Sequence, residues 1–181
     1  MDANAEPNEE QTRAVFAAYG LAVFLAQCVE RGLITLLTTY CAHAPLGSAE
    51  AAGWTRQDHD SARRAFERRT MGQLLKALAP HLTMERLKHL DGSLGTALDR
   101  RNWLAHHYFW QRALDFCTAA GQLKMLRELE DASTLFTTLN TELGAILDEW
   151  ATAHGVTPAE IAARADAALE EFRRASDGEG N

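Results

Sequence analysis

The residues best suited to do chemistry are concentrated in residues 99–109, where two adjacent arginines, an asparagine, two histidines and a tyrosine stand among apolar neighbours. On an ideal helix Asn102 and His106 lie about 40° apart, so the Asn102 amide can hydrogen bond one ring nitrogen of His106. That bond would fix the tautomer and leave the other nitrogen free for proton transfer. Arg101 lies about 140° from His106, so only its long side chain, a helix bend or a second copy of the chain would bring both groups to one ligand.

An arginine and a histidine together suit cleavage of a phosphodiester bond without a metal ion. The guanidinium of Arg101 stays charged and can bind phosphate through two hydrogen bonds, whereas His106 changes its charge near neutral pH. His106 would take the proton from a ribose 2′-OH or give one to the leaving 5′-oxygen. Arg101 would stabilise the negative charge on the pentacoordinate phosphorus. Because the nucleophile is the 2′-OH, the substrate would be RNA.

The sequence Arg-Asn-Trp-Leu-Ala-His at residues 101–106 resembles the Arg-x4-6-His signature of the HEPN superfamily, and residues 106–108 extend the likeness to Arg-x4-His-x-Tyr. The second form is found in toxins paired with small nucleotidyltransferase antitoxins. The resemblance implies a bundle of four or five helices that forms a homodimer, with two motifs facing one cleft. It also implies a metal-independent endoribonuclease, without a cofactor, that acts in toxin–antitoxin or antiviral defence. By position, Arg101 and His106 would be catalytic and Asn102 would orient the histidine.

The same resemblance makes Tyr108 a candidate site of AMP modification by a nucleotidyltransferase-type antitoxin. Another residue, Glu30, interrupts an apolar stretch and would pair with Arg101 or Arg31 inside the bundle. Alternatively, Glu30 is an exposed neighbour of Arg31 without a special role.

Two further residues of the segment, Arg100 and His107, are candidate supporting residues. His107 points about 100° away from His106, so the two rings would chelate a metal poorly on a regular helix, and no metal site is predicted. The three cysteines are scattered and form no Cys-x-x-Cys pair, which favours buried free thiols. They are Cys28, Cys41 and Cys117.

A non-catalytic helical module is the main alternative. In that case the polar residues of the motif would satisfy one another across a dimer interface, or would bind RNA, a nucleotide or a protein partner without cleavage. The aromatic residues Trp103, Phe109 and Trp110 surround the motif. They favour core and interface packing over base stacking. A third interpretation is a toxin subunit silenced by a regulatory partner.

The charge is unevenly distributed along the chain. The 181 residues carry a formal charge of −7, which disfavours nonspecific binding to nucleic acid. Residues 1–31 contribute −3, residues 32–112 contribute +4 and residues 113–181 contribute −8. The basic middle segment contains the Arg101–His106 motif, so it predicts either a focused phosphate site or an ordinary solvated helix face.

The length and composition predict a single soluble domain. Apolar residues make up 46% and charged residues 24% of the chain, which fits neither a disordered nor a membrane protein. The longest apolar run, residues 14–26, is shorter than the roughly 20 residues that a bilayer requires. It follows acidic residues rather than a basic segment, so no signal peptide, no membrane and a cytoplasmic location are expected.

The elements that must position the motif are predicted to be helices, because no stretch alternates with the period of a strand. We expect an all-α, up-down bundle of four to five main helices in residues 1–155, and an additional C-terminal helix with a disordered tail in residues 156–181. The expected helices span residues 9–42, 60 or 61 to 80, 82–90, 93–121, 122–153 and 158–174. Asp91-Gly92 is expected to stop the short helix at residues 82–90. Gly155 is expected to end the helix at residues 122–153.

Three local features refine these helices. Thr157 and Glu160 form a predicted capping box, with Pro158 at the first helical position. Gly32 and Gly72 lie inside expected helices, at a cost of about 1 kcal/mol each relative to alanine. Close helix packing, or the approach of a second copy, would explain them.

Overall fold

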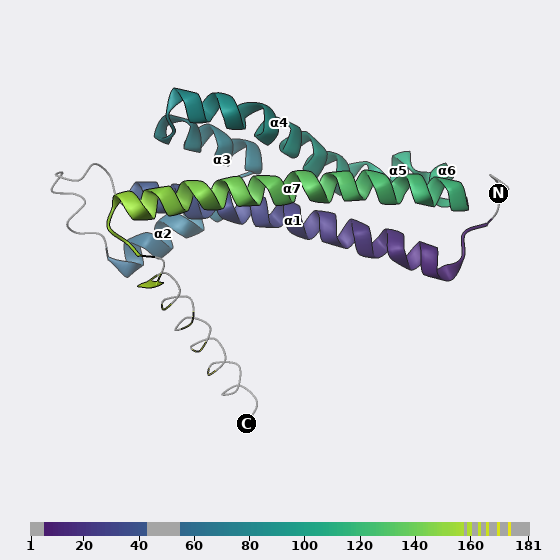
Figure 1. Ribbon diagram of the computed structural model, residues 1–181, viewed down its shortest axis with the longest axis horizontal. Helices are drawn as coiled ribbons and strands as arrows, with labels where there is room; N and C mark the ends of the chain where they lie inside the picture. Colours follow the sequence, from purple (N-terminus) through teal and green to yellow (C-terminus); the bar gives the residue numbers. More distant parts are fainter. Residues whose placement is uncertain are drawn as a thin grey trace. The chain divides into compact units, whose positions relative to one another are not determined.

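The computed structural model describes residues 6–42 and 55–157, together with a few positions between 159 and 174. Contacts divide the chain into one unit of residues 1–143 and a second of residues 144–181. Within the described residues every regular element is a helix, so the predicted all-α class is confirmed (Figure 1). Pro45, Gly47 and Gly53, which we expected to break the first helix, lie outside the described residues.

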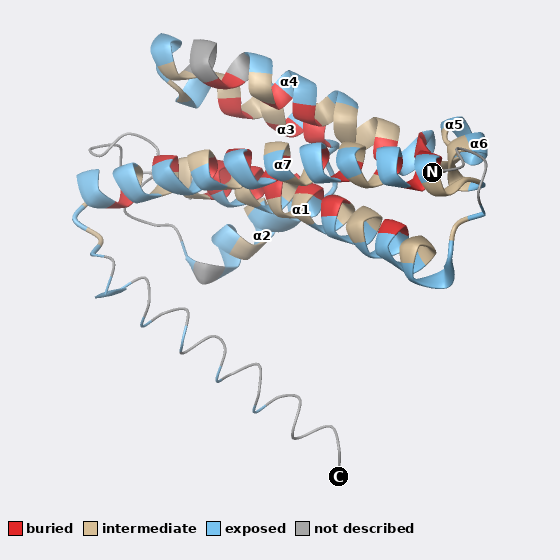
Figure 2. Cartoon of the chain, turned by 45° about the vertical axis from the view of Figure 1, so that its right-hand side comes forward, coloured by how far each residue is buried: buried red, intermediate tan, exposed pale blue. Residues whose placement is uncertain are grey.

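The first unit is organised around two long helices. Helix α1 spans Glu9–Ala42, as predicted, and α7 spans Ala119–Ala153. They run in the same direction, because Gln11 donates a hydrogen bond to the Ala119 carbonyl at 2.6 Å and Asn140 donates one to the Leu25 carbonyl at 3.3 Å. The buried residues lie on the sides of the helices that face one another (Figure 2). Those of α1 and α7 with no more than 1% exposure include Val15, Ala22, Val29, Leu33, Leu129, Phe136 and Leu139.

The single helix expected from residue 60 or 61 to residue 80 is wrong. The structure has α2 at Arg56–Glu67, α3 at Met71–Leu78 and a short 3-10 turn, η2, at Ala79–His81. Thr55 and Thr70 begin α2 and α3 respectively, each in a reciprocal capping box. Gly72 is therefore near the start of α3 rather than in mid-helix, and a Cβ there would lie in ordinary contact with Leu98.

The expected stop at Asp91-Gly92 is also wrong. Helix α4 spans Met84–His106 without interruption and runs antiparallel to α1. Its inward side carries Leu90, Leu94 and Ala97, all nearly inaccessible to solvent. Burial of this side on both flanks of Gly92 offsets the unfavourable helix propensity of glycine, which is about 1 kcal/mol.

The helix predicted to end near Gly121 instead ends at His106. His107 has a non-helical backbone, and two single-turn helices follow it, α5 at Tyr108–Gln111 and α6 at Ala113–Phe116. They turn the chain into α7 at a tight corner, where a Cβ on Gly121 would overlap the backbone of Asp115. Gly32 is similarly close to its neighbour, because a Cβ there would lie 3.1 Å from Leu143. The expectation of close helix packing at Gly32 is thus confirmed.

The second unit contains the end of α7. Gly155 has a φ of 71°, as a helix-terminating glycine requires, and the Val156 N–H donates to the Ala151 carbonyl at 2.9 Å. The Thr157 hydroxyl accepts a hydrogen bond from the Glu160 N–H, and the Glu160 carboxylate accepts one from the Thr157 N–H. The predicted capping box is confirmed.

Candidate functional site

Arg101 lies on the side of α4 that faces α1. Its Nε is 2.9 Å from Oε1 of Glu30, and the two side chains are 36% and 25% exposed. Arg31 pairs instead with Glu67 on α2, at 2.6 Å. Of the pairings considered for Glu30, the structure therefore shows the one with Arg101.

The ion pair leaves part of the guanidinium uncommitted. A second nitrogen of Arg101 donates a hydrogen bond to Oδ1 of Asn102 at 3.2 Å. Among the described residues, Oε1 of Glu30 is shielded from solvent but accepts no hydrogen bond with good geometry. The contact with Glu30 is therefore mainly ionic, and it holds the guanidinium at the edge of α1.

A small hollow lies beside this ion pair, between α1 and α4. Its volume is about 140 Å³, below the roughly 300–1,000 Å³ of ordinary small-molecule sites. It is therefore too small for a whole small-molecule ligand. Its lining consists of Val23, Ala26, Gln27, Arg101, Leu104 and Ala105.

His106 is the last residue of α4 and is exposed to solvent. Within the described structure its ring makes no hydrogen bond, and the ring of His107 is 6.2 Å away between centroids. The hydrogen bond expected between Asn102 and His106 is not formed among the described residues, and the Asn102 carbonyl oxygen accepts from Arg101. The His106 imidazole is therefore free to meet a substrate, but nothing in the monomer orients it.

The structure does not bring Arg101 and His106 together. The helix break at His107 comes after both residues, so both remain on the regular part of α4 and on different sides of it. Tyr19 of α1 stabilises this end of α4, because its hydroxyl donates to the Leu104 carbonyl at 3.1 Å. A ligand or a second copy of the chain would have to bridge the two groups.

Tyr108, the predicted AMP acceptor, is a core residue. It is 1% exposed, its hydroxyl donates to the Met125 carbonyl at 3.0 Å, and its ring stacks on Tyr19. Burial raises the pKa of the phenol, and the nearby Glu128 carboxylate raises it further. AMP transfer to this hydroxyl therefore requires α5 to separate from α7.

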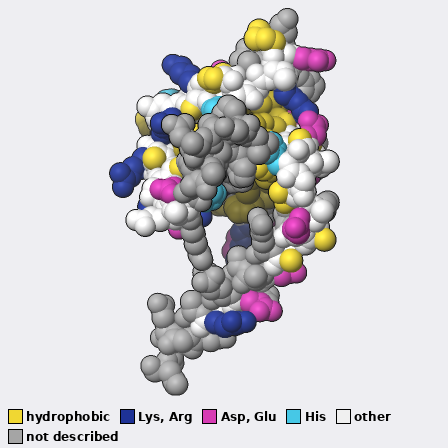
Figure 3. Space-filling model, turned by 90° about the vertical axis from the view of Figure 1, so that its left-hand side faces the viewer, with side chains coloured by type: hydrophobic (Ala, Val, Ile, Leu, Met, Phe, Trp, Pro, Cys, Tyr) yellow, Lys and Arg dark blue, Asp and Glu magenta, His cyan; other side chains and the backbone are white. Residues whose placement is uncertain are grey.

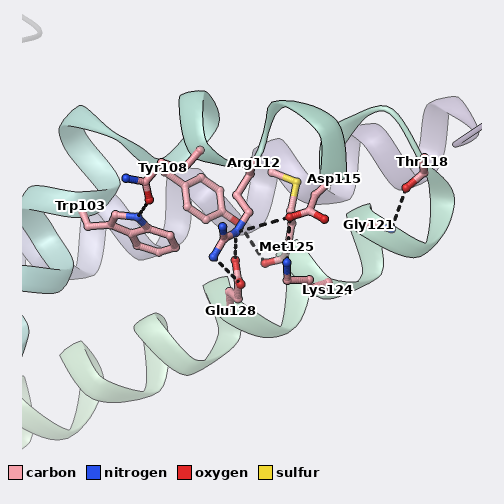
Figure 4. A network of polar contacts seen from close by, with 10 residues as sticks. Trp103, Tyr108, Arg112, Asp115, Thr118, Gly121, Lys124, Met125 and Glu128 are labelled. Atoms are coloured by element: carbon pink, nitrogen blue, oxygen red, sulfur yellow. Dashed lines mark hydrogen bonds and ion pairs between the residues drawn. The ribbon is translucent and has the colours of Figure 1, made fainter.

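A second polar group, which sequence reasoning missed, closes the corner behind Tyr108 (Figure 4). Arg112 makes two hydrogen bonds to Glu128, at 2.7 and 2.9 Å, and these bonds raise the pKa of the guanidinium. Asp115 lies 3.7 Å from Arg112 and 2.9 Å from Lys124. No sequence motif signals this network, because its members come from different helices.

The predicted supporting residue Arg100 lies over Trp103. The guanidinium carbons of Arg100 and Arg112 are 5.1 and 5.3 Å from the centre of the indole, whose N–H donates to Gln111 at 2.8 Å. Trp103 also contacts Tyr108 edge-on, so it serves packing at this end of α4. Trp110, in contrast, is 87% exposed.

In the described part of the basic middle segment, several cations are paired with carboxylates, among them the arginines at positions 63, 101 and 112. At the end of the molecule where α2 lies, basic side chains are interspersed with acidic and apolar ones (Figure 3). Cys117 is exposed and Cys28 and Cys41 are half-buried, which corrects the expectation of buried thiols. The described residues contain no cluster of metal-ligating side chains.

Comparisons with family models, curated proteins and solved structures found no match. In the described part of the chain, one helix is long and apolar enough to cross a membrane, at Glu9–Cys41. Core helices of soluble proteins and signal sequences share these properties, and many residues of this helix pack in the core.

Proposed function

We propose that the protein is a metal-independent endoribonuclease in which His106 transfers a proton and Arg101 holds the scissile phosphate. The observation that carries this proposal is the contrast within one segment of α4. Arg101 is held at a small hollow by Glu30 and Asn102, whereas the imidazole of His106 is exposed and unbonded within the described structure. Both groups have the chemistry that cleavage next to a ribose 2′-OH requires.

The reaction would proceed by attack of the 2′-oxygen on phosphorus. The new bond to the 2′-oxygen forms as the bond to the 5′-oxygen breaks, giving a 2′,3′-cyclic phosphate and a free 5′-OH. His106 either removes the 2′-OH proton or protonates the leaving 5′-oxygen, and Arg101 stabilises the extra charge on the phosphoryl oxygens. Glu30 would be a positioning residue, since it contacts Arg101 and not the reacting atoms.

The test is cleavage of single-stranded RNA in excess EDTA by the purified protein. His106→Ala and Arg101→Ala should each lower the rate by about 100-fold or more. His59→Ala is the control, because it removes an exposed imidazole on α2, away from the motif, and it should cleave at nearly the wild-type rate. Intact RNA with the wild type, or equal cleavage by all variants, would overturn the assignment.

Two further readouts identify the chemistry. Labelling of new ends by polynucleotide kinase should succeed without phosphatase treatment, because the products carry 5′-OH groups. Replacing the ribose at the cleaved position with deoxyribose should abolish cleavage. A rate that rises with pH would identify His106 as the base, and a rate that falls would identify it as the acid.

The alternative function is a non-catalytic helical module that binds RNA, a nucleotide or a protein. It is favoured by the lack of contact between Arg101 and His106, and by the ion pair that already occupies Arg101. In that case no variant cleaves RNA, whereas Glu30→Gln should change ligand affinity or the oligomeric state. Measurement of both properties on the same samples separates the two functions.

The resemblance of the motif further suggests a role in toxin–antitoxin or antiviral defence, in the cytoplasm, with a nucleotidyltransferase-type antitoxin or other regulatory partner. Expression of the chain alone should then arrest growth, and His106→Ala should relieve the arrest. The burial of Tyr108 adds a condition to this role. An antitoxin that modifies Tyr108 must act on an opened form of the corner.

A further inference from the structure

One side of α1 is apolar and exposed over much of its length. Five residues on this side follow one another at intervals of three and four, the spacing of a helix–helix seam. They are Ala14, Ala17, Leu21, Phe24 and Cys28. We call this set the α1 stripe. Leu21 is 53% and Phe24 59% exposed, although both are large apolar side chains.

Opposite charges stand at the two ends of the α1 stripe. The same spacing continues to Glu10 before Ala14 and to Arg31 after Cys28, and both charged residues are exposed. Within the stripe itself there is no charge. Gly20 lies beside its midpoint, and a Cβ there would meet no atom within 4 Å. Residues 10 and 31 are equally far from this midpoint. When a second α1 is placed antiparallel to the first, the acidic end of each stripe therefore meets the basic end of the other.

We propose that a second copy of this chain binds along the α1 stripe, with the two α1 helices antiparallel and the two-fold axis passing near Gly20. This arrangement places the acidic end of each stripe, at Glu10, opposite the basic end of the other, at Arg31. Phe24 then faces the smaller Ala17 of the partner's stripe, and the two copies of Leu21 meet near the two-fold axis. A parallel pairing would instead set like charges against each other at both ends.

The charge pattern favours a second copy over a lipid surface. Anionic membranes attract clusters of Lys and Arg, whereas the exposed first turn of α1 carries Glu9 and Glu10. Arg31 pairs with Glu67 at 2.6 Å but is 67% exposed, so its other donors can meet a carboxylate of the second copy. Binding to a membrane or to another segment of the same chain would be a different outcome of the tests below.

This dimer would place two candidate sites on one face. In an antiparallel pair the two-fold axis is perpendicular to the plane that contains both helices. A given flank of α1 therefore lies on the same side of this plane in both copies. Gln27 and Val23, on one flank of the stripe, line the hollow that contains Arg101. The interface itself does not rest on ribonuclease activity, so dimer formation without cleavage would refute the proposed function alone.

The first experiment measures the orientation by cross-linking. In a background of Cys41→Ser and Cys117→Ser, Cys28 is combined with Ala14→Cys and treated with a short bismaleimide. A covalent dimer is expected, since residue 14 of one copy faces residue 28 of the other. Within one chain the two positions are about 21 Å apart along the helix, which is beyond the linker. Thr35→Cys with Cys28 is the matched control and should remain monomeric on a denaturing gel.

Three results would overturn the proposal. Efficient cross-linking through Cys28 alone would indicate parallel helices, and cross-linking of the Thr35→Cys control would indicate nonspecific collision. A wild-type protein that sediments as a monomer at micromolar concentration would exclude the dimer. This holds equally if the α1 stripe is found to bind lipid vesicles or another segment of the chain.

The second experiment weakens the interface by substitution. Phe24→Glu should shift the dimer dissociation constant at least 100-fold in analytical ultracentrifugation, while circular dichroism stays helical. Leu114→Glu, at an 88% exposed apolar position on α6, is the control and should leave dissociation unchanged. Glu10→Arg should weaken the dimer, and its combination with Arg31→Glu should restore it. Failure of the double reversal to restore association would contradict the antiparallel register.

Discussion

Two polar regions lie at the same end of α4, and they differ in how far their hydrogen-bonding groups are satisfied. At the corner, Arg112 makes two hydrogen bonds to Glu128 and the Tyr108 hydroxyl donates to a backbone carbonyl. Beside α1, Arg101 makes an ionic contact with Glu30, and His106 is exposed. Saturated groups stabilise a fold, whereas groups with free capacity are available to a ligand. Residues that are neighbours in sequence therefore differ in role, since those at the corner are structural and those beside α1 are candidate functional residues.

The largest expected effect concerns activity in the open region. His106→Ala should reduce RNA cleavage by about 100- to 10,000-fold, because a proton-transfer group is lost. The free energy of unfolding should change by less than about 0.5 kcal/mol, since the side chain is exposed. Initial rates and urea denaturation on the same preparation check both statements. A large loss of stability would show that His106 has a structural role.

Substitutions at the corner should instead change the stability of the fold. Gly121→Ala should lower the free energy of unfolding by about 2–3 kcal/mol, because the new methyl group overlaps the backbone of Asp115. Gly95→Ala is the control, since its Cβ would meet nothing within 4 Å, and it should stabilise α4 by about 0.5–1 kcal/mol. Thermal and urea unfolding measure both variants. Equal stability of the two would show that the corner relaxes readily.

Glu128 and Glu30 are a matched pair of carboxylates, one in each region. Glu128 is 20% and Glu30 25% exposed, yet only Glu128 accepts two well-aligned hydrogen bonds. Glu128→Gln should therefore cost about 1–2 kcal/mol of stability, and Glu30→Gln less than about 0.5 kcal/mol. Glu30→Gln should instead alter the KM for RNA. The reverse order of stabilities in urea denaturation would contradict the distinction between the regions.

The smallest expected effect is a dependence of stability on high pH. Burial raises the pKa of Tyr108 above its ordinary value, so the folded phenol stays protonated where the unfolded one ionises. The free energy of unfolding should therefore fall as the pH rises above about 10, the ordinary value for tyrosine. Tyr108→Phe should lack this contribution and should be about 1 kcal/mol less stable at neutral pH. Urea denaturation between about pH 9 and pH 11 compares the two proteins.

Helix boundaries could be predicted from the sequence where local signals agree. They could not be predicted where contacts between helices determine them. Helix α1 was predicted to the residue because a long apolar stretch lies between clear boundaries. The capping boxes that begin at Thr55 and Thr70 are visible in the sequence, but they were overlooked within a longer helical pattern. The uninterrupted course of α4 through Gly92 could not be predicted, because it depends on burial against other helices.

The same division applies to the candidate site. An unusual carboxylate in an apolar helix marked Glu30, and the structure shows which arginine it meets. The hydrogen bond between Asn102 and His106 was expected from ideal helix geometry, but in the structure the Asn102 side chain contacts the adjacent Arg101 instead. The pairing of Arg112 with Glu128 joins α7 to the turn after α5, so helical periodicity within one element gave no indication of it.

The packing of Tyr108 has a kinetic consequence. Its hydroxyl becomes accessible only while the corner is open, so a group transferred to it accumulates at a rate that the opening equilibrium sets, as in the exchange of a core amide hydrogen. Each stabilising change at the corner would slow that transfer without touching the enzyme that performs it. The extent of modification of Tyr108 would then report how often the corner has opened. Chains that have just been synthesised or are partly unfolded would be modified first.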